Sequence, residues 1–321
     1  MFDVCVDISE KYDFKVKETA KGRGITILHT DRGLMAFKEY KGSGKHLIWS
    51  NEVMEKIYQE GRVIVDSCVR NKEGEFITEA PDQSRYIIKN WYEARDCDVK
   101  RTEDLCMAVR GLAILHNQLE QYGGDDKLYV AKDLEREFDA HNLEIKRVRK
   151  YLYGKNNRTE FESLATNCCD LFLEEGKKAL ERLIEFEPEE RLQKKLCHGS
   201  YNFHNVCFKG NVPVIINFEK QNYNFLMMDL YCFLRKILEK NNWDIFLGQR
   251  LINEYDVERR IDIDDLGLLA ILFSYPEKFW KLLNGYYNSN KAWVPHKKLE
   301  KLEKLVEQNK LRQEFIKSIH S

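Results

Sequence analysis

Apolar and polar residues alternate in short runs through the first hundred positions of the chain. A period of two residues places successive side chains on opposite faces of a strand, so each run predicts a strand that is buried on one side. Turn-forming residues such as those at 31–33 and 72–74 separate several of the runs. The runs lie at 14–18, 25–30, 34–40, 63–69, 75–78 and 85–91.

One stretch in this part of the chain has a helical pattern instead. From position 45 to 60 the apolar residues recur at helical spacing, and Gly61 follows as a residue that commonly ends a helix. We therefore expect residues 1–95 to form an antiparallel β lobe with one helix.

From about Thr102 onward the pattern becomes helical, with apolar residues three or four positions apart. The change falls near 91–98, so residues 96–321 are expected to form a helical lobe, with a helical insert at about 125–190. The predicted helices lie at 102–119, 133–153, 160–185, 228–240, 245–255, 266–272, 277–287 and 297–319.

Composition narrows the class of protein. The 321 residues have a formal net charge of −1, whereas a nucleic-acid-binding protein usually has a basic excess. No apolar run approaches the roughly 20 residues that a membrane-spanning helix needs. The first residues lack the basic start and apolar core of a signal peptide. These patterns predict a cytoplasmic protein with no membrane span and no nucleic-acid partner.

The segment 197–205, Cys-His-Gly-Ser-Tyr-Asn-Phe-His-Asn, has the layout of the catalytic loop of small-molecule phosphotransferases. That loop reads H-G-D-x-x-x-x-N, and a short strand ending in I-D-F follows it. His198 and Asn205 stand at the right separation, but Ser200 replaces the first acid and Asn217 replaces the second.

Both acids matter for chemistry. The first orients the acceptor hydroxyl and takes its proton, and the second holds Mg²⁺ against the nucleotide phosphates. Ser200 is no base near neutral pH without an activating partner. Asn217 offers a neutral carbonyl, which binds a hard dication more weakly than a carboxylate does. The sequence therefore predicts a kinase-like fold in which the catalytic positions are relics.

Lys38 lies in the third alternating run, within Ala-Phe-Lys at 36–38. In kinase-like folds the lysine at this place contacts the nucleotide α- and β-phosphates and pairs with a glutamate of the next helix. Glu52 and Glu55 are the candidate partners, so all three residues are candidates for a nucleotide cleft. A strand lysine is more often simply solvated.

The chain resembles the CotS-type spore coat proteins of spore-forming bacteria, which are related to the aminoglycoside and choline phosphotransferases. Asp229 stands where this superfamily carries a structural acid. The matching stretches are 33–38, 110–116, 157–161, 196–205, 217–220 and 229–236. The resemblance implies a two-lobed, protein-kinase-like α+β fold that acts by binding during assembly of the outer layers of an endospore. It also implies other coat proteins as partners, and a path from the mother-cell cytoplasm to the spore coat.

Two other functions stay open. In one, the chain is an active ATP-dependent phosphotransferase for a small molecule, with Asn205, Asn217 and Glu219 as the candidate metal ligands and His204 as a base. In the other, the interlobe cleft binds ATP, with or without Mg²⁺, or another small molecule and does not turn it over.

Overall fold

A computed structural model describes residues 2–22, 24–122, 129–186, 192–288 and 296–319. The chain divides into two compact units. Unit 1 comprises residues 1–129, 195–229 and 257–259, and unit 2 comprises the remaining segments, 130–194, 230–256 and 260–321.

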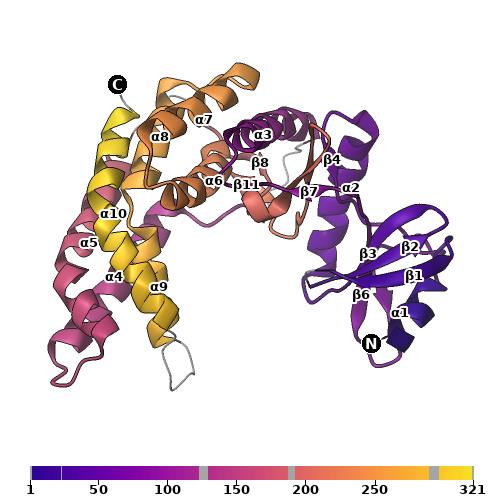
Figure 1. Cartoon of the computed structure of the whole chain (residues 1–321), viewed down its shortest axis with the longest axis horizontal. Coiled ribbons are helices and arrows are strands. Elements are labelled where there is room, and N and C mark those ends of the chain that lie inside the picture. The colour runs from indigo at the N-terminus through magenta and orange to yellow at the C-terminus, as the bar shows by residue number, and fades with distance from the viewer. Residues whose placement is uncertain (1, 23, 123–128, 187–191, 289–295, 320–321) are drawn as a thin grey trace. The chain divides into compact units, whose positions relative to one another are not determined.

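The first sheet of unit 1 is antiparallel and has the strand order β1-β2-β3-β6-β5 (Figure 1). The predicted sheet is therefore present. One face packs against the short N-terminal helix α1, and the other contacts α2, where Gly61 ends the helix in a left-handed conformation at φ 70°. The elements are α1 (Phe2–Ser9), β1 (Val16–Lys21), β2 (Thr26–Thr30), β3 (Gly33–Glu39), α2 (Gly44–Glu60), β5 (Thr78–Glu79) and β6 (Arg85–Asn90).

Two smaller sheets and a long helix complete unit 1. In the four-stranded sheet β4-β10-β9-β7, β10 is parallel to β4 and antiparallel to β9. In the other, β8 pairs with β11 and leads directly into the loop at 198–205. The elements are β4 (Ile64–Val65), β7 (Arg95–Asp96), α3 (Thr102–Tyr122), β8 (Lys195–Cys197), the 3-10 turn η2 (Phe203–Asn205), β9 (Val206–Lys209), β10 (Val212–Ile215) and β11 (Asn222–Asn224).

Unit 2 is helical, as the spacing of apolar residues predicts. Its core includes Phe172, Phe279 and Leu302, which are fully buried where α5, α9 and α10 meet. The expected insert at 125–190 contains α4 and α5, and both of its ends lie outside the described residues. The helices are α4 (Leu134–Tyr153), α5 (Glu160–Ile184), α6 (Leu226–Lys240), α7 (Ile245–Glu258), α8 (Ile263–Ser274), α9 (Glu277–Tyr287) and α10 (His296–Ser318). Across the described ranges, no helix combines the length and the apolar character needed to cross a bilayer.

Candidate functional site

Two lysines of unit 1 come from neighbouring strands and lie on the same face of the first sheet. β3 pairs with β6 so that Ala36 is opposite Lys89. The two-residue period of a strand then places Lys38 on this face as well. Phe37 points to the other face and is part of the core against α1.

Glu219 binds both ammonium groups. Its Oε1 lies 2.9 Å from Nζ of Lys38 and 3.1 Å from Nζ of Lys89. Lys89 is buried and also donates to Oδ2 of Asp66 at 3.1 Å. Burial alone would raise the pKa of Glu219, but Lys89 and Lys38 together lower it to about 2. The carboxylate is therefore ionised at neutral pH and held between two cations.

This arrangement corrects the expected pairing of Lys38 with Glu52 or Glu55. Both oxygens of Glu55 accept hydrogen bonds from Arg70, each at 3.1 Å, and Glu52 is exposed. A planar guanidinium binds a carboxylate in this bidentate way. Lys38 is left to pair with Glu219.

The loop that follows β8 is anchored by Asp229 at the start of α6. Its Oδ2 accepts the amide of His198 at 2.7 Å, and its Oδ1 accepts the amide of Gly199 at 3.0 Å. Nε2 of His198 donates to the carbonyl oxygen of Ile216 at 3.0 Å, and Nδ1 accepts the amide of Ser200 at 3.2 Å. His198 therefore acts as a neutral spacer between the loop and the end of β10.

Two buried histidines are expected to make the stability of unit 1 dependent on pH. Burial lowers the pKa of His198 and of His116, although Asp229 beside them favours the charged form. Each histidine binds a proton more readily when unfolded, so the free energy of unfolding should fall as the pH drops below about 6.5. The slope is at most about 1.4 kcal/mol per pH unit for each histidine.

Urea unfolding between pH 8 and pH 5 measures this dependence. A variant at an exposed histidine, His296→Gln, should keep it. A stability that does not change over this range would show that the two buried histidines are not neutral in the folded chain.

Direct hydrogen bonds connect the four positions that the sequence predicts to be relics, His198, Ser200, Asn205 and Asn217. Nδ2 of Asn217 donates to Oδ1 of Asn205 at 3.0 Å, and Nδ2 of Asn205 donates to the carbonyl oxygen of Ser200 at 2.9 Å. The backbone of Asn217 has φ 69°, a left-handed conformation that Asn adopts more easily than most residues do. Its amide donates to Oδ2 of Asp66 at 3.0 Å. The loop therefore retains its connections without an acid at either position.

The candidate ligands Asn205, Asn217 and Glu219 do not form a site that suits Mg²⁺. The dication prefers near-octahedral oxygen ligands, including carboxylates. Oδ1 of Asn205 already accepts a hydrogen bond from Asn217, and Oε1 of Glu219 accepts from two ammonium groups. Moving either lysine away from Glu219 would also leave a cation close to the incoming metal. His204, the other rescue candidate, lies in η2, and its ring packs against that of Phe203 at 4.0 Å between centroids with a tilt of 42°.

A second group of metal-ligating residue types is buried behind the loop. The donor atoms of His116, Cys197 and Asp229 lie within 4.8 Å of one another. Nε2 of His116 is 3.3 Å from Oδ2 of Asp229, whose oxygens also accept the two loop amides. The carboxylate is thus already engaged in hydrogen bonds that hold the loop, and we assign the group a structural role.

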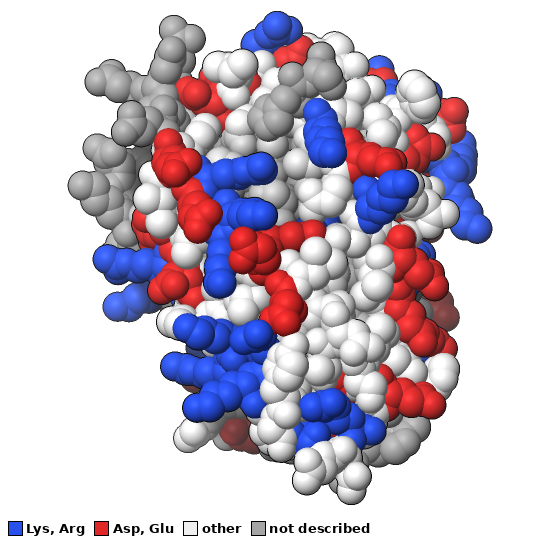
Figure 2. All heavy atoms as spheres, turned by 90° about the vertical axis from the view of Figure 1, so that its left-hand side faces the viewer, with Lys and Arg blue, Asp and Glu red and all other residues white. Residues whose placement is uncertain are grey.

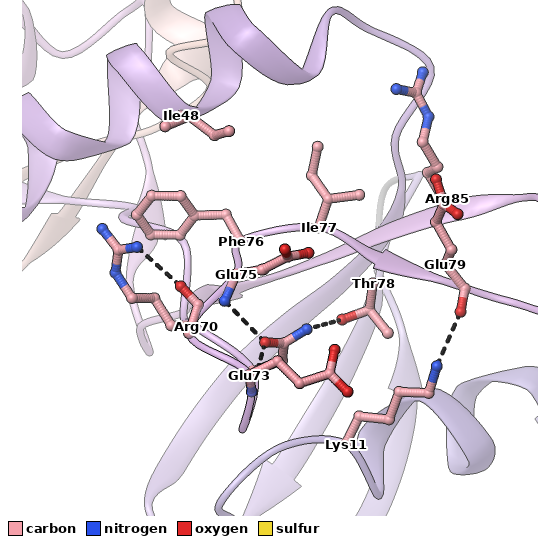
Figure 3. Close-up of a pocket in the computed structure, with 12 residues that line it drawn as sticks. Lys11, Ile48, Arg70, Glu73, Glu75, Phe76, Ile77, Thr78, Glu79 and Arg85 are labelled. Carbon is pink, nitrogen blue, oxygen red and sulfur yellow. Dashed lines mark hydrogen bonds between the residues drawn. The ribbon is translucent and has the colours of Figure 1, made fainter.

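A cavity of about 480 Å³ lies beside α2, and the predicted site residues are not among those that line it. Figure 3 shows Ile48 of α2 above Phe76 and Ile77, with charged side chains around them. The guanidinium of Arg70 stacks on Phe76 at 3.9 Å and also binds Glu55. Acidic and basic residues are mixed around this cavity, so its charge favours no particular ligand.

Comparison with solved structures identifies the fold. An aminoglycoside phosphotransferase from Alicyclobacillus acidocaldarius superposes with a TM-score of 0.85 at 18% identity, covering 98% of this chain and 94% of that one. The chain has the aminoglycoside phosphotransferase fold. An amicoumacin kinase bound to AMP-PNP and Ca²⁺ has a TM-score of 0.66 at 12% identity, over 98% and 93% of the two chains. A microcompartment-associated aminopropanol kinase has a TM-score of 0.62 at 12% identity, covering 100% of this chain and 99% of that one. No protein-family model matches.

Sequence reasoning missed three residues of this phosphotransferase-fold site. Asp66 and Lys89 each lie in an apolar run, at positions where alternation predicts a buried side chain. A charged residue at such a position indicates a buried ion pair, because buried charges are nearly always paired. His116 carried no comparable signal, since one histidine on a helix is most often an ordinary polar residue.

Proposed function

We propose that the chain is a pseudokinase, a phosphotransferase-fold protein that acts by binding and not by catalysis. The hydrogen bond between Nδ2 of Asn217 and Oδ1 of Asn205 carries this proposal. Two amides bind each other at the place where active relatives need an acid and an amide to hold a metal. Oδ1 of Asn205, an oxygen that a metal would need, is already engaged by Asn217 and so has little tendency to recruit a dication.

The position of the catalytic base supports the same conclusion. Oγ of Ser200 lies 3.5 Å from Nδ1 of His198, and this nitrogen already accepts the amide of Ser200. The imidazole is buried and its Nε2 donates to a backbone carbonyl. Phosphoryl transfer depends on positioning and on charge neutralisation, so losing both acids should remove most of the rate.

The biological setting follows from the sequence resemblance. The stretches around the loop and the start of α6 resemble CotS-type spore coat proteins. We propose that the chain is made in the mother-cell cytoplasm, joins the spore coat, and binds other coat proteins there. Fluorescent fusion in a sporulating cell tests this step, and a signal that stays diffuse in the mother cell would contradict it.

The pseudokinase proposal predicts no phosphotransfer. With aminoglycosides, choline or simple sugars as acceptors, the purified chain should consume ATP at the rate of a blank. The parent chain and Asn205→Ala should then be indistinguishable. ATP consumption well above the blank that Asn205→Ala abolishes would show that the loop is catalytic.

An active small-molecule phosphotransferase is the alternative, and the enzymatic names of the similar structures favour it. In that case Glu219 would leave the two lysines and act as the metal ligand. Calorimetric titration with ATP, with and without Mg²⁺, separates the candidates. Continuous heat from turnover supports the enzyme, saturable binding without turnover supports a nucleotide-binding pseudokinase, and no heat supports a role through protein contacts alone.

A further inference from the structure

The end of α4 and the turn after it are strongly basic. Residues 146–158 hold six Lys and Arg and no Asp or Glu. Because the whole chain has a net charge of −1, the rest of it carries −7. The lower left of Figure 1, where α4 ends and α5 begins, faces the viewer in Figure 2, and Lys and Arg gather toward the lower edge of that face.

Four of these six cations have no acidic partner in the described part of the chain: Arg158 donates to backbone carbonyl oxygens of Leu152 and Tyr153, and the other three lie on α4. Lys146, Arg147 and Lys150 are exposed, and within the described ranges no acidic side chain lies within ion-pair distance of them. By contrast, Arg149 pairs with Asp170, and Lys155 binds Glu162 at 2.7 Å. The face defined by Lys146, Arg147 and Lys150 is called the α4 basic face below.

The α4 basic face is unfavourable for the helix itself. Lys146 and Lys150 are four residues apart, and Arg147 and Lys150 are three apart, so like charges are neighbours on the helix surface. The helix dipole favours a cation in the last turn, which explains Lys150. It does not explain Lys146 and Arg147, which lie one turn earlier. A bound anionic partner would remove this repulsion.

A small cavity adjoins the face. It has a volume of about 250 Å³ and lies where α4 meets α9, with Arg147 among the residues that line it. About half of its wall is apolar and includes Val148, Leu283 and Trp280. Glu144 also lines it, and its Oε2 accepts hydrogen bonds from Trp280 and Asn284. The hydroxyl of Tyr287, another wall residue, is buried and has no hydrogen-bond partner among the described residues. The cavity could hold one aromatic side chain, and the hydroxyl of Tyr287 could form a hydrogen bond with a tyrosine there.

We propose that the α4 basic face binds an acidic segment of another protein, with one aromatic side chain of that segment in the cavity. Opposite charges would guide the approach, and the buried anchor would fix the register. The charge of −7 on the rest of the chain would repel a long polyanion such as DNA or a broad anionic membrane. A short acidic peptide can avoid that repulsion. This proposal does not depend on the function proposed above.

Synthetic polymers test the proposal with the full chain. Fluorescence anisotropy at low salt would compare labelled poly-glutamate with a random copolymer of glutamate and tyrosine. The copolymer should bind more tightly, and both affinities should fall as salt is added. A thymidine oligonucleotide and vesicles containing phosphatidylserine serve as rival anions. Tighter binding of either rival than of the copolymer, or no binding of the copolymer, would overturn the proposal.

Two triple variants locate the contact. Lys146→Gln with Arg147→Gln and Lys150→Gln should weaken copolymer binding about tenfold or more, because three exposed ion pairs are lost. The matched control changes Lys301, Lys304 and Lys310 of α10, all exposed, to glutamine. It removes the same charge and should leave the affinity nearly unchanged. Equal losses in the two variants would mean that only net charge matters, and would overturn the assignment to α4.

The anchor has its own test. Val148→Phe fills the cavity and should abolish the advantage of the copolymer over poly-glutamate, while poly-glutamate still binds. A thermal melt shows whether this variant folds. If it does not fold, the comparison of the two polymers on the parent chain decides the matter alone, since equal affinities would exclude an aromatic anchor.

Discussion

Replacing Lys89 with methionine is expected to lower the free energy of unfolding by about 3–5 kcal/mol. Lys89 is 5% exposed and binds the carboxylates of both Asp66 and Glu219. Asp66 is 2% exposed, and Oδ1 of its carboxylate already has no hydrogen-bond partner within the described part of the chain. Without the ammonium group a buried negative charge would remain with no compensating cation. Urea unfolding followed by circular dichroism measures the loss.

Lys38→Met is the matched control, because Lys38 binds the same oxygen of Glu219. The side chain of Lys38 is 35% exposed, and exposed ion pairs contribute no more than about 1 kcal/mol. Equal losses for the two variants would mean that burial does not distinguish them. Adding Asp66→Asn to Lys89→Met should recover part of the stability, since it removes the charge left behind.

The second large effect concerns Ser200 and Asn217, which stand where the catalytic-loop motif has acids. Ser200→Asp with Asn217→Asp should raise the affinity for ATP in Mg²⁺ by about tenfold or more, because one new charge-assisted contact contributes about 1.5 kcal/mol. The side chain of Asn205 lies 3.5 Å from Oγ of Ser200 and accepts a hydrogen bond from the side chain of Asn217, so the new carboxylates would converge on one place. In chelator the same charges would repel the phosphates, and the affinity should fall below that of the parent chain.

Calorimetry in Mg²⁺ and in chelator measures both changes. Ser163→Asp with Asn253→Asp adds the same charge at two exposed positions of unit 2 and should change neither affinity appreciably. If the relic-site variant binds like the parent in both conditions, positions 200 and 217 do not form a nucleotide site. Turnover is not expected to return, because a metal site alone does not position an acceptor.

The sheet and most helices were predictable because their side chains follow simple periods. The helices α4 and α5 appear within a residue or two of their expected ends. The run at 63–69 was predicted as one strand, but only Ile64–Val65 forms a strand, which joins the sheet of β10, while Cys68 makes an isolated antiparallel bridge with Lys89. A period of two identifies an extended segment without naming its partner. Helix α1 went unpredicted, because eight residues with mixed polarity give a weak signal.

The site was harder to predict because its contacts span long distances in sequence. The loop motif placed His198, Ser200, Asn205 and Asn217 together, and hydrogen bonds among these segments connect them. The partner of Lys38 was sought in the next helix, but the partner is 181 positions away along the chain. A local sequence pattern cannot tell which of several carboxylates the tertiary fold brings close to Lys38.

The anchoring of the loop by Asp229 limits which loop residues can be replaced during evolution. The amides of His198 and Gly199 bind a carboxylate that is 2% exposed, so they should exchange with deuterium only when unit 1 opens broadly. A Cβ on Gly199 would lie 1.9 Å from the carbonyl oxygen of Lys220, so even alanine is excluded there. Purifying selection on foldability alone would then preserve a histidine and a glycine that catalysts keep for chemistry. On the pseudokinase proposal, the persistence of this kinase-like signature would accordingly record thermodynamic constraint and not catalysis.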